Sequence, residues 1–218
     1  MLIQCLGHSK FLVTLMTGYR IVTDPFDAST GYPVAVTEAD AVLVSHHHHD
    51  HDAVETVKGY TTVIDQEGRH RLDGDIFVKS LKSFHDDQHG ALRGSNLIHC
   101  IQAEGLSLVH LGDLGHLPDT ELTEQIGRPD ILMVPIGGFF TIDAQTAMET
   151  CEMLRPKIIL PMHYKTAFNS DWPIAKPEAF VTLCENRFGS TPEELDILRV
   201  TADDIDCQPH VAFLKAQV

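Results

Sequence analysis

Four consecutive histidines inside the chain, followed by Asp-His-Asp, constrain this sequence more than any other feature. The run SHHHHDHD covers Ser45–Asp52 and begins at the end of an apolar strand expected over Ala41–Ser45. Because the run is internal and follows a strand, it is not the remnant of an affinity tag. Histidines at this density either ligate a cation or repel one another once protonated, which disfavours a merely solvated loop. The run therefore predicts a metal site.

Only one register of the run matches the spacing H-x-H-x-D-H, and it selects His46, His48, Asp50 and His51. Starting at His47 would put His51 where the aspartate belongs. Residues two apart in an extended segment point to the same side, so His46 and His48 can hold one ion together. Where the chain turns, Asp50 and His51 are redirected towards a second ion. The intervening histidines receive no ligand role.

Four residues cannot complete two metal sites, so the remaining ligands must come from other strand ends. His85 ends the segment FVKSLKSFH, Asp113 ends SLVHLGD and His163 ends IILPMH. Sites in layered α/β folds form where strand ends gather along one edge of a sheet. We therefore expect these three side chains to converge on the histidine run. His89 competes with His85 for the same position, and His85 is preferred because it ends its strand directly.

The composition indicates one folded domain spanning residues 1–218, since 43% of the chain is hydrophobic and this length suits a single core. A formal net charge of −15 disfavours nucleic acid as a partner, because phosphate binding requires a basic face. No stretch resembles a signal peptide or a membrane span. The five scattered cysteines form no CxxC pair and indicate free thiols in a reducing compartment. We therefore expect a cytoplasmic protein without a membrane partner.

Apolar patterning predicts a mixed α/β fold in which hairpins come first and helices later alternate with strands. One helix is expected after Asp52, ending at Gly59; a second begins after Asp143 and a third near Pro177. Hairpin turns are expected at 17–19 and at 104–105. The expected strands are Phe11–Met16, Arg20–Thr23, Ala41–Ser45, Thr61–Ile64, Ile76–Phe84, Asn96–Ala103, Ser107–Leu111, Ile131–Pro135, Lys157–Pro161 and Val211–Leu214.

Taken together, these motifs resemble those of the metallo-β-lactamase-fold hydrolase superfamily. SHHHHDH matches its signature motif, and SFHDDQHG, HLGD and LPMHY follow in the expected order. GHSKFLVT and IVTDPF resemble its first hairpin and the turn after it. Within the superfamily, GHS, DPF, GDLGH, PIGG and PMHY look most like the small bacterial hydrolases related to ascorbate-phosphate lactonase. The resemblance implies a four-layer αββα sandwich with its metals at one edge.

The resemblance also implies how the ligands are divided between two ions. His46, His48 and His85 hold the first ion, Asp50, His51 and His163 hold the second, and Asp113 bridges them. Nitrogen and oxygen ligands without thiolate suit zinc and tolerate manganese, iron or nickel. We expect the two ions to share a hydroxide that attacks an ester, lactone or phosphodiester bond of a small substrate, with Asp50 orienting the hydroxide.

Two other activities occur on the same scaffold. A di-iron oxidoreductase is disfavoured because such relatives usually carry glutamate at the position of His48 and depend on a flavin domain. A nuclease of the tRNA-processing or β-CASP type is disfavoured because those enzymes carry an extra arm or domain, for which this short acidic chain leaves little room. A complete ligand set also disfavours a binding protein with a dead site.

Residues beside the motifs are candidates for substrate contacts, namely His116, Tyr164, Lys165 and Arg93. Candidates for an apolar pocket wall are Phe139, Phe140 and Trp172. We expect His8 and Asp24 to brace the ligand loops rather than to touch metal. Related proteins often assemble, so a homo-oligomer is compatible with these expectations.

Overall fold

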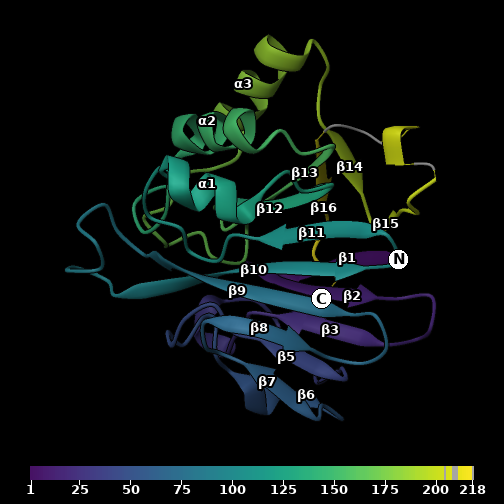
Figure 1. Cartoon of the computed structure of the whole chain (residues 1–218). Coiled ribbons are helices and arrows are strands. Elements are labelled where there is room, and N and C mark those ends of the chain that lie inside the picture. Colours follow the sequence, from purple (N-terminus) through teal and green to yellow (C-terminus); the bar gives the residue numbers. More distant parts are fainter. Residues whose placement is uncertain (204, 208–210, 218) are drawn as a thin grey trace.

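The computed structural model describes residues 1–203, 205–207 and 211–217, and two six-stranded sheets stack at its centre (Figure 1). The first sheet has the order β15-β1-β2-β3-β5-β7. Its strands are β15 (Leu198–Arg199), β1 (Leu2–Gly7), β2 (Lys10–Thr14), β3 (Arg20–Thr23), β5 (Ala41–Leu43) and β7 (Thr62–Ile64). The hairpin predicted around residues 17–19 is confirmed as β2 and β3, which pair antiparallel.

The second sheet has the order β13-β12-β11-β10-β9-β8. Its strands are β13 (Ile158–Met162), β12 (Ile131–Pro135), β11 (Leu106–His110), β10 (Ser95–Ala103), β9 (Phe77–Phe84) and β8 (Gly68–Arg71). Two short pairs lie outside these sheets, β4 (Thr37–Glu38) with β6 (Val57–Lys58) and β14 (Glu193–Leu195) with β16 (Ala212–Leu214). The predicted hairpin at residues 104–105 is confirmed as β10 and β11.

Alternating side chains of β12 build two separate cores. Ile131 and Met133 belong to the apolar cluster between the two sheets, whereas Leu132 and Val134 belong to the cluster beneath the helices. Successive side chains of a strand point to opposite faces, and a strand covered on both faces is apolar throughout. This double burial explains why the run Ile131–Pro135 shows no polar alternation.

Helices α1 (Thr120–Ile126), α2 (Ala144–Leu154) and α3 (Glu178–Phe188) cover the outer face of the second sheet (Figure 1). The helices expected after Asp143 and near Pro177 are confirmed as α2 and α3. Asp143 caps α2 by accepting a hydrogen bond from the backbone N–H of Thr146 at 2.9 Å, as Asp at an N-cap does. Helix α1 was not predicted, because its seven residues bury only Leu122 and so show no apolar stripe.

The helix predicted after Asp52 is wrong. The structure has a single 3-10 turn over Val54–Thr56 there, without a side-chain cap. The backbone N–H of Ala53 donates to the carbonyl of Pro25 at 2.8 Å, which holds the chain against the first sheet. Val57 then enters β6 and packs in a small cluster with Val22 and Val42. The outer layer on this side of the αββα sandwich is therefore a turn and a strand pair.

The strands bring their carboxyl ends to one edge of the second sheet. Strands β11, β12 and β13 run parallel, and β9 runs in the same direction because β10 is antiparallel to both β9 and β11. The segments that follow these strands therefore leave the sheet side by side, near the loop that follows β5. A hydrogen bond from the Leu97 N–H to the Ser45 carbonyl, 2.8 Å long, joins the two sheets at this edge. Within the described residues, no helix is both long and apolar enough to cross a membrane.

Candidate metal centre

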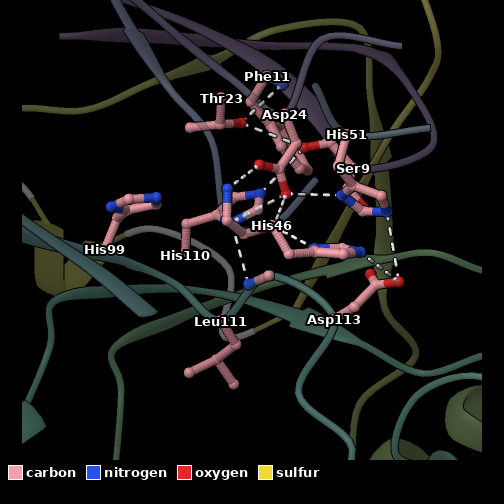
Figure 2. A network of polar contacts seen from close by, with 12 residues as sticks. Ser9, Phe11, Thr23, Asp24, His46, His51, His99, His110, Leu111 and Asp113 are labelled. Carbon is pink, nitrogen blue, oxygen red and sulfur yellow. Dashed lines mark hydrogen bonds and ion pairs between the residues drawn. The ribbon is translucent and has the colours of Figure 1, made fainter. Parts of the chain in front are cut away.

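Asp24, at the end of β3, organises the loop that carries the histidine run (Figure 2). Its carboxylate accepts hydrogen bonds from the Ser45 backbone N–H and from the Ser45 hydroxyl, each 2.7 Å long. The His51 Nδ1 lies 2.8 Å from the same carboxylate, and the Ser45 hydroxyl lies 2.9 Å from the His46 Nδ1. With their Nδ1 atoms engaged, His46 and His51 present Nε2 to the centre. The bracing role expected for Asp24 agrees with these contacts.

The seven residues selected from the sequence converge in space, although they span more than a hundred positions. Ligand-type atoms within 4.8 Å of one another form one group from His46, His48 and His85. A second group contains Asp50, His51 and His163, together with His8, and a third joins Asp113 to His46 and His51. The first two groups contain the two sets implied by the family resemblance, and the second also includes His8. Their role as metal ligands remains a prediction.

The Asp113 carboxylate lies between the two histidine groups. Its Oδ2 is 3.2 Å from the Nε2 atoms of both His85 and His163, and 3.3 Å from the His51 Nε2. The His46 Nε2 lies farther away, at 3.9 Å. One oxygen atom thus faces four imidazoles from three different parts of the chain, which is the arrangement that a carboxylate shared by two cations requires.

Asn96 on β10 fixes the backbone that carries Asp113. Its Oδ1 accepts from the Asp113 N–H at 2.9 Å, and its Nδ2 donates to the Ser83 hydroxyl at 2.8 Å. Gly112 makes this approach possible, because a Cβ there would lie 2.3 Å from the Asn96 Oδ1. Its φ of 56° also falls in the region that favours glycine. The motif HLGD therefore needs its glycine for packing rather than for chemistry.

Coulombic attraction within the cluster sets its protonation states. Burial raises the pKa of Asp113, but the imidazoles of His163 and His51 hold it well below its usual range. Burial also raises the pKa of Asp50, and the attraction of His51 reverses that effect. In His51 burial lowers the pKa, and Asp113 and Asp50 raise it well above its usual value. Burial lowers the pKa of His46 well below its usual value. The ionised carboxylates and the neutral imidazole of His46 are forms that ligate cations, and a cation bound at His51 would displace the proton of that ring.

Polar atoms without a hydrogen-bond partner accumulate at this centre. They include the Nε2 of His46 and of His51, the Oδ1 of Asp113, and both ring nitrogens of His8 and of His163. Folded proteins pair nearly all buried polar atoms, so such a concentration needs a partner that the chain itself does not supply. A divalent cation would satisfy these atoms, and a nitrogen and oxygen set without thiolate suits zinc and related metals. The residues present therefore fit the metal that the resemblance implies.

A cavity of about 610 Å³ opens onto the centre. His48, Asp50, His85 and Asp113 form part of its wall; the rest is formed by Ser29, His49, Arg93, Phe140, Asp171, Trp172 and Pro173. The Arg93 guanidinium lies 5.7 Å from the centre of the Phe140 ring. A second cavity of about 650 Å³, against β8 and β9, is lined by none of the candidate metal ligands. Of the expected wall residues, Phe140 and Trp172 line the metal-side cavity, whereas Phe139 lines a different hollow.

Three of the four candidate substrate contacts lie outside this cavity, and only Arg93 lines it. His116 contacts the Phe84 backbone and the Leu117 carbonyl. Tyr164 packs edge-on against Phe213 in the helical core, with 5.6 Å between ring centroids. Lys165 is half-buried in the chain that follows β13, where its backbone N–H pairs with the Ala175 carbonyl. Tyr164 and Lys165 were selected because they follow His163 in sequence. The backbone turns sharply at His163, whose φ is 52°, and neither side chain lines the cavity.

Three further residues lie at the centre, and only His8 had an expected role, which was to brace the ligand loops. His8 enters the second ligand group, and Asn96 holds Asp113 as described above. His110 at the end of β11 lies 3.9 Å from the Asp24 carboxylate and contacts the Ser9 carbonyl at 3.0 Å (Figure 2). His89, the alternative to His85, is exposed beside Phe84 and lies outside all three groups. The motifs GHS and HLGD contain His8 and His110, but no role of its own was predicted for His110.

Comparisons with known proteins agree with this architecture. A family model described as the beta-lactamase superfamily domain matches residues 2–163. A UPF0173 metal-dependent hydrolase of Thermococcus onnurineus is 32% identical over 213 residues, which cover 83% of this chain and 91% of that protein. A relative with the same description from Carboxydothermus hydrogenoformans is 33% identical over 205 residues, covering 80% of this chain and 87% of that protein.

Two solved structures are similar over nearly the whole chain. A Thermotoga maritima protein, described among the Zn-dependent hydrolases of the metallo-β-lactamase superfamily, has a TM-score of 0.78 and 33% identity, and covers 98% of this chain and 97% of its own. Isothiocyanate hydrolase from Delia radicum gut bacteria has a TM-score of 0.71, covering 93% of this chain and 100% of its own. Its 13% identity supports a shared fold alone.

The substitution Asp24→Asn tests the bracing of the ligand loop. Asparagine keeps the size of the side chain and tolerates the φ of 39° at this position, but it removes the charge that faces His51. We expect metal affinity to fall by roughly 10- to 100-fold, as it does when the partner of a ligating histidine is removed. Isothermal titration with Zn²⁺ measures this change.

Asp130→Asn is the matched control, because Asp130 also accepts from the backbone N–H and hydroxyl of one serine, Ser107, at 2.8 and 2.9 Å. The control variant should keep the metal affinity of the unmodified protein. Equal losses in the two variants would contradict a specific role for Asp24.

Proposed function

Because this chain belongs to the beta-lactamase superfamily and is a metal-dependent hydrolase, we propose that it uses two divalent metal ions to cleave an ester, lactone or phosphodiester bond in a small substrate. One observation carries the proposal: the Asp113 Oδ2 lies 3.2 Å from His85 in one ligand group and 3.2 Å from His163 in the other. A single carboxylate oxygen between two groups of imidazoles supports a centre with two ions rather than one.

The donor sets assign residues to each ion. The first ion would be held by His46, His48 and His85, the second by Asp50, His51 and His163, with Asp113 contributing to both. Zinc suits the imidazole and carboxylate donors best, and manganese, iron or nickel are compatible with them. When bound, such ions would supply a water that is nucleophilic near neutral pH and positive charge opposite the oxygen that becomes negative.

Asp50 combines access to the cavity with the ability to take up a proton. It lines the cavity wall although it is 8% exposed overall. Its Oδ2 lies 3.5 Å from the His51 Nε2 and 3.3 Å from the His8 Nε2. Because His51 holds the pKa of Asp50 below its usual range, against the effect of burial, the carboxylate is ionised at neutral pH. It can therefore accept a hydrogen bond from an attacking water and orient it, and we propose that the proton of that water passes to a carboxylate oxygen of Asp50.

The cavity wall favours a small substrate with an anionic group. Its volume of about 610 Å³ lies in the range of small-molecule sites, roughly 300–1,000 Å³. Phe140 and Trp172 supply apolar surface that excludes water. Among the described residues, no carboxylate forms an ion pair with Arg93, which lines the same cavity. Arg93 can therefore bind a substrate carboxylate or phosphate, as a guanidinium does with planar fork geometry.

Metal removal tests the proposed reaction. We expect hydrolysis of a p-nitrophenyl ester, a lactone or bis(p-nitrophenyl) phosphate to disappear in chelated protein and to return with Zn²⁺ or Mn²⁺, because the donors act only through the ions. Substrate turnover and elemental analysis of the same samples measure both quantities. Hydrolysis that survives in rigorously metal-free protein contradicts the proposal. Bound iron with redox activity and no hydrolysis, or cleavage of RNA alone, also contradicts it.

The substitution Asp50→Asn tests the proton-accepting carboxylate. We expect kcat to fall by roughly 100- to 10,000-fold, the usual contribution of a general base, because the amide cannot accept the proton. Steady-state kinetics at saturating metal measures the loss. Asp171→Asn is the matched control, since Asp171 lines the same cavity but belongs to none of the ligand groups. A loss no larger than that of the control would contradict the assignment.

A further inference from the structure

His8 occupies a constrained position in the turn between β1 and β2. Its φ of 52° lies in the left-handed region, where residues other than glycine are uncommon. The preceding Gly7 makes room for the turn, because a Cβ there would lie 2.6 Å from the Tyr32 ring. Backbone strain that persists in a folded protein marks positions where the side chain has a specific task. The turn directs the His8 ring inward, where it is 4% exposed.

The His8 ring lies among the residues of the second ligand group. Its centroid is 4.1 Å from that of His163 and 5.4 Å from that of His51. Trp172 covers its other side, with 5.2 Å between centroids. Its Nδ1 has no polar partner, and its Nε2 has only the Asp50 carboxylate, at 3.3 Å. Leaving a buried polar group unpaired costs about 1–3 kcal/mol, so the packing alone does not explain a histidine at this position.

The donor atoms of His8, Asp50, His51 and His163 all lie within 4.8 Å of one another. The His8 Nε2 is 3.3 Å from the Asp50 Oδ2, and the His51 Nε2 is 3.5 Å from the same atom. Two donors at a tetrahedral angle around zinc, with bonds of about 2.0–2.1 Å, are separated by roughly 3.3 Å. His8 thus stands at the same distance from Asp50 as an accepted ligand of one ion would.

We propose that His8 is a further protein ligand of the second metal ion, alongside Asp50, His51, His163 and the shared Asp113. This inference rests on the proposed two-ion function and adds a residue that the signature motifs do not include. It makes the two positions unequal. With Asp113 counted in both, the second position has five protein ligands, four of them buried together in one group. The first position has four, one of which is the exposed His48, and it is therefore the position more open to substrate.

A bracing role makes a different prediction. If His8 only supported the Asp50 carboxylate, its removal would weaken metal binding by roughly 10- to 100-fold, without changing the donors around the ion. If His8 is a ligand, its removal lowers the affinity for one of the two ions by more than about 100-fold, beyond the loss expected for a bracing residue, and leaves the affinity for the other ion unchanged. The two roles also differ in the visible absorption of bound Co²⁺, which responds to the number of nitrogen donors.

The experiment compares the unmodified chain with His8→Asn, because asparagine tolerates a left-handed backbone. His99→Asn is the matched control: His99 is also buried with an unpaired Nε2 but lies outside the ligand groups. Co²⁺ is titrated into metal-free protein, and stoichiometry, both affinities and the visible spectrum are recorded. We expect the unmodified chain and His99→Asn each to bind two ions and to give the same visible spectrum. His8→Asn should lose more than about 100-fold in affinity for one ion, with an altered spectrum.

An unchanged spectrum, or a loss of about 100-fold or less, overturns the ligand role of His8 while leaving the two-ion centre intact. If the unmodified chain binds only one Co²⁺ ion, the proposed two-ion function itself is overturned. If His8→Asn does not fold, proton NMR of the unmodified Co²⁺ protein decides the question. The ligand role requires one shifted exchangeable imidazole proton beyond those of His46, His48, His51, His85 and His163, and its absence rejects that role.

Discussion

The buried carboxylate of Asp113, facing the imidazoles of His51, His85 and His163 at 3.2–3.3 Å, is the interaction on which the rest of the centre depends. Gathering several ionisable groups in a nearly solvent-free place is unfavourable unless charge is balanced and polar atoms are paired. Hydrogen bonds within the chain, through Asp24, Ser45 and Asn96, engage the outer nitrogens of His46 and His51 and the backbone of Asp113. The inner atoms remain unpaired and converge, so the fold prepares a place for cations.

The strand arrangement explains why distant parts of the chain meet there. Strands β9, β11, β12 and β13 point their carboxyl ends to one edge, and the loop after β5 reaches the same edge from the other sheet. Three residues of the centre, His8, Asp24 and His163, have positive φ, so the chain bends sharply as it delivers them. Packed apolar layers on both sides of β12 hold these bends in place. The sheets hold the backbone rigid, and the candidate metal ligands lie on the segments that follow the strand ends.

Much of this could be predicted where a local pattern has a single physical meaning. Ile131–Pro135 is apolar throughout because both faces are covered, and His46, His48, Asp50 and His51 follow from spacing. The helix after Asp52 was wrong because its capping pattern ignored the tertiary hydrogen bond from Ala53 to Pro25. His116, Tyr164 and Lys165 were chosen for closeness to motifs in sequence, which does not report the direction of a side chain after a sharp turn. The position of His8 depends on a strained backbone that no spacing reveals.

Anomalous diffraction from crystals grown with Zn²⁺, recorded on both sides of the zinc absorption edge, tests the central claim most directly. The account predicts two separate peaks, one among His46, His48 and His85 and the other beside Asp50, His51 and His163, with the Asp113 carboxylate between them. A single peak, or zinc bound away from Asp113, would contradict it.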